Sequence, residues 1–177
     1  MFIPGWLISL VTFPGVVVHE AAHRFFCDVT DTPVYEVSYF RPKGKPAGYV
    51  IHGRPRTLGA ALLISGGPLL INTALCALLT LAVAYQHFVL NAGVHGPVLL
   101  LLAWLGYSIG MHAIPSRQDA ASFTAQVKEA RGQGITLLLA QVLSGLITLA
   151  NALRIIWFDA IYAVGVSLAL PVLLGAL

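Results

Sequence analysis

Charged side chains are scarce in this sequence. Asp, Glu, Lys and Arg make up 10% of its 177 residues, whereas 58% are hydrophobic and the mean hydropathy is +0.83. Soluble domains carry about a quarter charged residues, so this composition excludes a soluble globular domain and predicts an integral protein of the lipid bilayer. The net charge is only +3. Because the basic residues gather in loops, the sequence indicates no nucleic-acid partner.

The sequence has only two cysteines, and it also lacks internal repeats and the features of a signal peptide. Cys27 and Cys76 lie on opposite sides of a long polar segment and have no metal or redox spacing, so we assign them no chemistry. The 177 residues can build one compact helical bundle, which predicts a single domain over residues 1–177, and the chain shows no internal repeat. No Lys or Arg precedes the first apolar segment and no small-residue cleavage pattern follows it. That segment therefore predicts a membrane span rather than a signal peptide.

Long apolar segments recur along the chain. A membrane-spanning helix needs about 20 apolar residues. The sequence accordingly predicts an all-α integral membrane fold of about five transmembrane helices, at residues 2–27, 58–90, 96–114, 135–150 and 160–177. Pro14-Gly15 can kink the first of these helices.

The polar segment after the first span contains half of the chain's ten Lys and Arg residues. Two stretches rich in β-branched and aromatic residues flank an Arg-Pro-Lys-Gly-Lys-Pro turn, which predicts a small extramembrane β-hairpin at residues 33–52. Basic residues concentrate at 24–56 and 117–131 and are absent between the second and third spans. Positive loops face the cytoplasm. We therefore expect a protein of the cytoplasmic (plasma) membrane of a prokaryote, with its active site toward the cytoplasmic face.

The motif His-Glu-Ala-Ala-His occupies residues 19–23, at the end of the first apolar segment. Two histidines four residues apart on a helix point the same way and can bind one zinc ion. Glu20 can take a proton from a water molecule that zinc acidifies and pass it to the leaving amine. The alternative is an interhelical hydrogen-bond cluster. Three ionisable groups within five positions of an apolar helix are costly, which favours a functional site.

A third zinc ligand must come from elsewhere in the chain. Asp119 is the best candidate, because it follows a span that ends on the same membrane face as His19 and His23, and its carboxylate suits zinc. Two histidines and one carboxylate leave one position open for water. Asp119 also has capping-box spacing from Ser116, so it can instead start a helix. These two roles are compatible, and His112 is the alternative ligand.

Three polar residues are candidates for contact with the substrate or the developing oxyanion. Asn72, inside an apolar segment, either bonds a neighbouring helix or donates to the substrate. His112 and His52 can approach the zinc or the reacting carbonyl, although a surface position also accounts for His52. The predicted hairpin either packs over the site or offers a strand edge with which an extended substrate pairs.

At this point the sequence resembles the site-2 protease family of intramembrane zinc metalloproteases. The zinc motif lies on a transmembrane helix, Gly67-Pro68 is followed by Asn72, and residues 112–119 stand where the family has Asn, two apolar residues, Pro and then Asp-Gly. The chain departs from that pattern with His112 in place of Asn and Ala120 in place of Gly. The resemblance implies a divergent, minimal member without PDZ or CBS domains.

The resemblance and the motif together predict a zinc metalloendopeptidase. It would cleave a membrane-associated or transmembrane peptide, with His19, His23 and Asp119 binding Zn²⁺ and Glu20 as the acid/base. The alternative function is a noncatalytic zinc-binding membrane scaffold or carrier. A carrier would need more ionisable residues along its spans than this sequence has.

Overall fold

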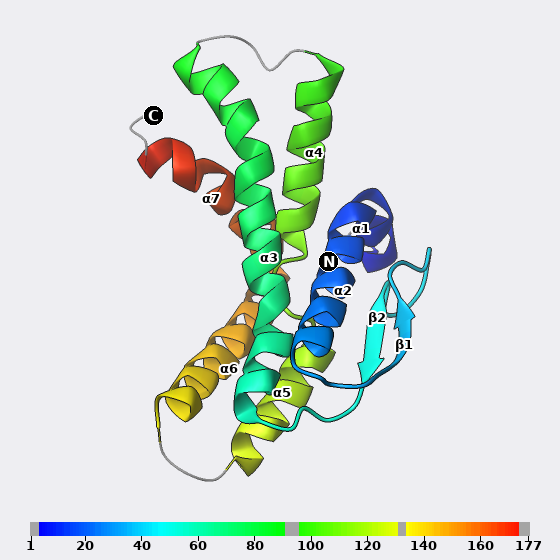
Figure 1. The fold of residues 1–177 in the computed structure, drawn as a ribbon. Coiled ribbons are helices and arrows are strands. Elements are labelled where there is room, and N and C mark those ends of the chain that lie inside the picture. Colours follow the sequence, from blue (N-terminus) through cyan, green and yellow to red (C-terminus); the bar gives the residue numbers. More distant parts are fainter. Residues whose placement is uncertain (1–3, 91–95, 131–133, 174–177) are drawn as a thin grey trace.

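Helices make up most of the computed structural model, which describes residues 4–90, 96–130 and 134–173 (Figure 1). Within these ranges the helices are α1 (Gly5–Val11), α2 (Phe13–Val29), α3 (Leu58–Ala84), α4 (Pro97–Met111), α5 (Arg117–Glu129), α6 (Ile135–Leu153) and α7 (Phe158–Leu173). A π-helical turn (Tyr85–Val89) continues α3, and a 3-10 turn (Arg154–Ile156) joins α6 to α7. The ends of the predicted first and last spans, residues 2–3 and 174–177, lie outside the described residues.

Two of the described helical stretches are long and apolar enough to cross a membrane, Leu58–His87 with 30 residues and Ile135–Ile156 with 22. A third span results if α1 and α2 count as one broken span. Helix α4 is apolar but has only 15 residues, which span roughly 22 Å against a hydrocarbon core of about 30 Å. The predicted helical fold with a small β-hairpin is confirmed, and two or three of its described helices are candidate membrane spans. The prediction of about five spans is not supported, since the helices support two or three.

The predicted first span is not one helix. Helices α1 and α2 meet at Thr12 with a bend of 87°. Pro14 lies in the first turn of α2, where its missing N–H costs nothing, but its ring prevents the helix from continuing back through Thr12 into α1. The Thr12 hydroxyl donates to the Ile8 carbonyl at 2.7 Å, which satisfies one of the last carbonyls of α1. The kink that Pro14 indicates is therefore a full break.

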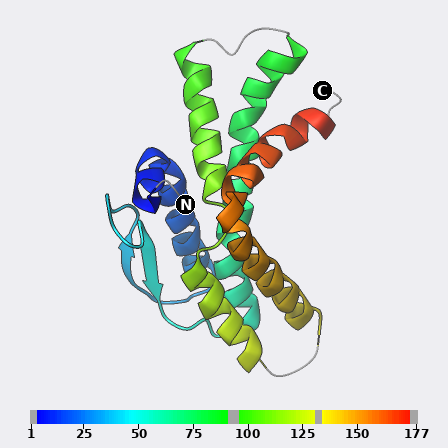
Figure 2. The same cartoon turned by 180° about the vertical axis from the view of Figure 1, so that it is seen from behind.

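Helix α3 runs through the middle of the molecule and packs against α2, α4 and α7 (Figures 1 and 2). Small residues let these helices approach closely. At the crossing of α2 and α4, the Gly15 N–H donates to the Ser108 hydroxyl at 3.1 Å, and a Cβ on Gly15 would overlap the Ser108 carbonyl oxygen. At the crossing of α2 and α3, a Cβ on Gly67 would overlap the ring of Phe26.

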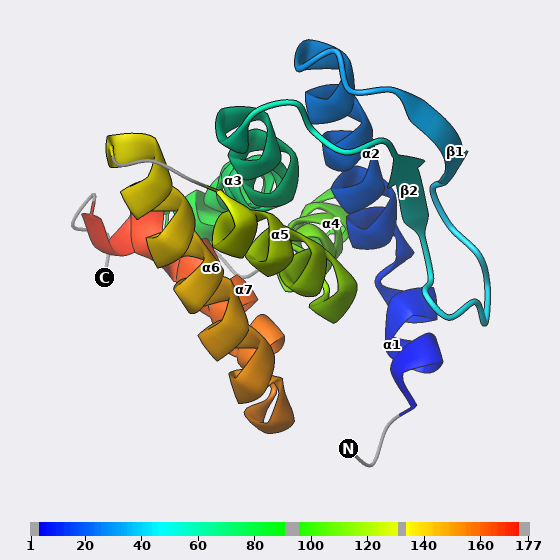
Figure 3. The ribbon, with the colours of Figure 1, turned by 90° about the horizontal axis from the view of Figure 1, so that it is seen from below.

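The hairpin and α5 flank α2 and α3 at one end of the molecule (Figure 3). Strands β1 (Val34–Ser38) and β2 (Tyr49–His52) pair antiparallel, which confirms the predicted hairpin. Strand β2 lies on the side of the bundle and β1 lies outside it (Figures 1 and 3). Helix α5 packs between α3 and α6 around the fully buried Phe123. The segment 117–129, polar in sequence, is thus an amphipathic helix.

The crossing of α2 and α4 generates a first prediction. We expect Gly15→Ala to lower the free energy of unfolding by about 1–3 kcal/mol, because the added methyl meets a backbone oxygen that cannot move aside. A Cβ on Gly145, in the middle of α6, would meet no atom within 4 Å, so Gly145→Ala should instead stabilise the helix by up to about 1 kcal/mol. Thermal unfolding of both variants in detergent measures the difference. Equal stability of the two variants would contradict this helix crossing.

Candidate metal centre

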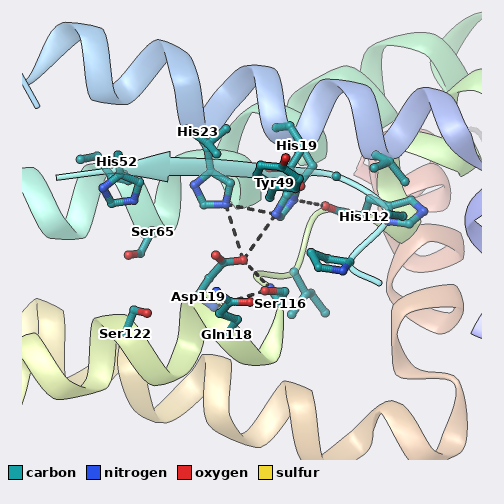
Figure 4. A pocket seen from close by; sticks show the side chains of 18 of the residues that line it. His19, His23, Tyr49, His52, Ser65, His112, Ser116, Gln118, Asp119 and Ser122 are labelled. Atoms are coloured by element: carbon teal, nitrogen blue, oxygen red, sulfur yellow. Dashed lines mark hydrogen bonds and ion pairs between the residues drawn. The ribbon is translucent and has the colours of Figure 1, made fainter. Parts of the chain in front are cut away.

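Two helices bring the candidate ligands together. Helix α2 carries His19 and His23, which are both buried, and the first turn of α5 carries Asp119. The two imidazole rings point toward the Asp119 carboxylate (Figure 4). His19 Nε2 and His23 Nε2 are 3.2 Å apart, and Asp119 Oδ2 lies 3.8 Å from the former and 3.6 Å from the latter. Three atoms that can bind a metal thus form a compact triangle.

The triangle has the dimensions of a zinc site. Zinc bonds of about 2.1 Å to nitrogen and oxygen, arranged tetrahedrally, separate neighbouring ligand atoms by about 3.4 Å. The separations between the two Nε2 atoms and Asp119 Oδ2 run from 3.2 to 3.8 Å. Two neutral imidazoles and one carboxylate are also a donor set that zinc prefers. The residues therefore fit the metal in both geometry and chemistry.

The tautomer of His19 follows from its second nitrogen. His19 Nδ1 lies 2.6 Å from the main-chain carbonyl of His112, and a carbonyl only accepts, so Nδ1 carries the proton. In the neutral ring, Nε2 then presents its lone pair to His23 and Asp119. Metal-binding histidines generally donate their other N–H in this way, which fixes the ring. His23 differs, because its Nδ1 is buried without a hydrogen-bond partner among the described residues.

Asn72 donates a hydrogen bond to the same His112 carbonyl. Its side chain is fully buried, and Nδ2 donates to the carbonyls of Ile109 at 3.1 Å and His112 at 3.2 Å. The carbonyl of Gly15 lies 3.4 Å from the same nitrogen. This amide therefore ties α3 to α4 and α2. Its donor group is directed at main-chain carbonyls, so the geometry favours the structural role among the two that the sequence left open.

Asp119 forms the helix cap that its spacing predicts, and its carboxylate also faces the two histidines. Its N–H donates to the Ser116 hydroxyl at 3.2 Å, and the Ser116 N–H donates to Asp119 Oδ2 at 2.9 Å, which completes a capping box at the start of α5. The same Oδ2 faces His19 and His23. Burial alone would raise the pKa of the Asp119 carboxyl, but hydrogen bonds and charge interactions with the two histidines in their protonated form outweigh burial and hold that pKa well below its ordinary value. The group is thus a carboxylate, the form that binds metal.

The other two candidate histidines lie outside the triangle. The His112 ring turns away toward the break between α1 and α2, where its Nε2 is 2.8 Å from the Thr12 hydroxyl. His52 Nδ1 donates to the Gly53 carbonyl at 2.7 Å, and the ring lies beside Ser65 in the close-up (Figure 4). Neither belongs to the group of residues that could bind one metal within the described chain. Both side chains line the cavity around the site.

A cavity of about 750 Å³ surrounds the triangle and is lined by Glu20, the hairpin segment 46–55 and residues of α5. Glu20 is buried, and its side chain lies directly under the hairpin. A Cβ on Gly48 would come within 2.7 Å of Glu20 Cγ and 3.0 Å of Glu20 Oε1. Sequence reasoning missed this contact. Gly48 lies within the predicted hairpin, but no local pattern says that a helix will approach it.

No protein-family model, no curated protein and no solved structure matches this chain. The resemblance to site-2 proteases stays a prediction from the sequence.

If Asp119 binds zinc as well as capping α5, two substitutions should have different outcomes. Asp119→Ala removes a ligand and the cap, whereas Asp119→Asn keeps an oxygen that can accept from Ser116. We expect Asp119→Ala to weaken zinc binding by more than about 100-fold, beyond what loss of an outer-sphere partner costs. It should also destabilise the zinc-free protein by about 1 kcal/mol. Asp119→Asn should bind zinc weakly while keeping that stability.

Competition with a chromophoric chelator measures the zinc affinity of each variant, and circular dichroism follows thermal unfolding of the zinc-free protein. Undiminished zinc affinity in Asp119→Ala would leave Asp119 with the capping role alone.

Proposed function

We propose that this protein is a zinc-dependent intramembrane endopeptidase, a divergent relative of the site-2 proteases. His19, His23 and Asp119 hold the metal, and Glu20 is the general acid/base. The observation that carries the proposal is the convergence of two Nε2 atoms and one carboxylate oxygen, 3.2 to 3.8 Å apart, in a cavity that Glu20 also lines. These residues come from α2 and α5, which are about 100 positions apart.

Zinc, when bound, supplies acidification of water and polarisation of the scissile carbonyl. Glu20 takes up the proton of the attacking water and hands it to the nitrogen of the departing peptide. Its neighbours suit this role. The hairpin backbone at Gly48 lies against the Glu20 side chain and limits its movement, and the buried setting strengthens its interactions with charge that develops during the reaction.

The proposed substrate is a membrane-associated or transmembrane peptide that enters in extended form. Helical peptide bonds are shielded until the helix unwinds. Strand β2 pairs with β1 along one edge, and residues Tyr49–His52 line the cavity. An unwound segment can add to β2 through main-chain hydrogen bonds, which demand little of its sequence. The hairpin then presents the peptide bond beside Glu20, because Gly48 immediately precedes the strand.

The proposed location is the cytoplasmic membrane of a prokaryote, with the site toward the cytoplasm. The apolar helices that could span a bilayer support a membrane location. The orientation is supported by the basic residues of the loops next to the site. Both the hairpin, with Arg41, Lys43 and Lys45 in its turn, and α5, which begins at Arg117, border the cavity side of the molecule.

Glu20→Gln tests the proposed chemistry. The substitution keeps the size of the side chain but removes the group that accepts the proton, and it leaves the three ligands in place. We expect stoichiometric zinc and a cleavage rate about 100- to 10,000-fold lower on a membrane-peptide substrate in detergent or proteoliposomes. Metal analysis and gel-based cleavage measure the two quantities.

Asp28→Asn is the matched control, because Asp28 is an exposed residue of α2 that pairs with Arg24 and does not line the cavity. It should cleave at the wild-type rate. If the wild type binds zinc but shows no cleavage that depends on Glu20, the noncatalytic zinc-binding scaffold or carrier is favoured instead.

A further inference from the structure

Arg154 reaches the segment that precedes the third ligand, although it lies 35 residues further along the chain. It belongs to the 3-10 turn Arg154–Ile156 between α6 and α7. Its Nη2 donates to the carbonyl of Ile114 at 3.1 Å and lies 3.5 Å from that of Pro115. From the last turn of α6, Asn151 Nδ2 also donates to the Pro115 carbonyl, at 3.2 Å. Two side chains of α6 and its turn thus hold the carbonyls just before Ser116.

The guanidinium of Arg154 is itself held in place. Its Nε lies 2.9 Å from Asp159 Oδ2, and its Nη1 donates to Asn151 Oδ1 at 2.8 Å. Trp157 adopts a left-handed conformation with φ 62° and ψ 35°, which turns the chain so that α7 starts beside Arg154. Such a backbone is unfavourable for a bulky residue and persists where the surroundings enforce it. The planar guanidinium of Arg154 therefore has a fixed orientation where it contacts the carbonyls of Ile114 and Pro115.

One peptide group connects Arg154 and Asn151 to the ligand oxygen. The Pro115 carbonyl and the Ser116 N–H belong to the same planar peptide unit, which resists twisting. Asn151 and Arg154 hold its carbonyl end, and the Ser116 N–H at its other end donates to Asp119 Oδ2 at 2.9 Å. Hydrogen bonds accepted by the carbonyl also polarise the N–H and strengthen its donation. The direction of Oδ2 toward His19 and His23 thus depends on this peptide plane.

We propose that Arg154, assisted by Asn151, is a positioning residue for the metal ligand Asp119. The inference rests on the proposed function, because it assumes that Asp119 binds zinc. Within the described part of the chain, Arg154 forms no hydrogen bond or ion pair with His19, His23 or Asp119, although it lines the same cavity. Its role is to fix residues 114–116, which lie between α4 and α5 and have no helical ladder of their own to hold them.

The test compares zinc binding by Arg154→Met with that by Arg54→Met. Methionine is nearly as long as arginine but cannot donate to the Ile114 and Pro115 carbonyls. We expect Arg154→Met to weaken zinc binding by about 10- to 100-fold, as loss of an outer-sphere partner does. The absorption spectrum of the Co²⁺-loaded protein should change, because it reports ligand geometry. Arg54→Met removes an exposed ion pair with Glu129, of 2.5 Å, and should leave both readouts unchanged.

A positioning role requires these changes at an unchanged fold, so thermal unfolding of the zinc-free variants is followed by circular dichroism. Arg154→Lys keeps the charge beside Asp159 but has a single nitrogen, which cannot serve Asn151, Asp159 and both carbonyls together. It provides a folded variant where Arg154→Met does not fold. We expect its zinc affinity to fall between those of the wild type and Arg154→Met, with an altered Co²⁺ spectrum.

Wild-type affinity and spectrum in a folded Arg154→Lys or Arg154→Met would overturn the inference and leave the metal site standing. Absence of zinc from the wild type, or undiminished zinc in Asp119→Ala, would overturn the proposed function and this inference together.

Discussion

The main-chain carbonyl of His112 accepts hydrogen bonds from both His19 and Asn72, and the arrangement of the site depends on this one oxygen. The last carbonyls of a helix have no partner within the helix, and in a membrane such groups must find partners inside the protein. His112 caps the C-terminal end of α4. The early end of α4 leaves it too short for a full span, and the same early end provides the acceptor that orients His19.

The close approach of α2 to α4 makes this contact possible. Gly15 lies one helical turn before His19, and its lack of a side chain lets the α2 backbone lie against Ser108. On the other side of the crossing, the Thr12 hydroxyl meets the His112 ring. The backbone of His112 therefore orients the His19 ring, while the His112 side chain packs against the break that starts α2. His112, the residue that caps α4, thus contacts both His19 of α2 and Thr12, the residue just before α2.

Local patterns predicted the features that depend on neighbours in sequence. The motif at residues 19–23 lies on a helix, the hairpin forms within residues 33–52, and Ser116 and Asp119 form the capping box that their spacing indicates. Features that depend on distant residues were not predictable in this way. The number of spans was overestimated because apolar composition does not say where a buried helix ends. The contact of Arg154 with the Pro115 carbonyl joins residues 39 positions apart, and no local pattern encodes it.

The sequence presents metal binding and helix capping as alternative roles for Asp119, but the two roles are physically compatible. A carboxylate oxygen has more than one lone pair, so Oδ2 can accept from the Ser116 N–H and still face the two imidazoles. The start of α5 also favours a negative charge, because the first N–H groups of a helix point toward it. Capping therefore fixes the position of the Asp119 carboxylate whether or not a metal is bound. An acidic residue in the first turn of a helix that lies opposite a pair of histidines combines local stability with a preformed donor. The structural role thus strengthens the case for the metal-binding one.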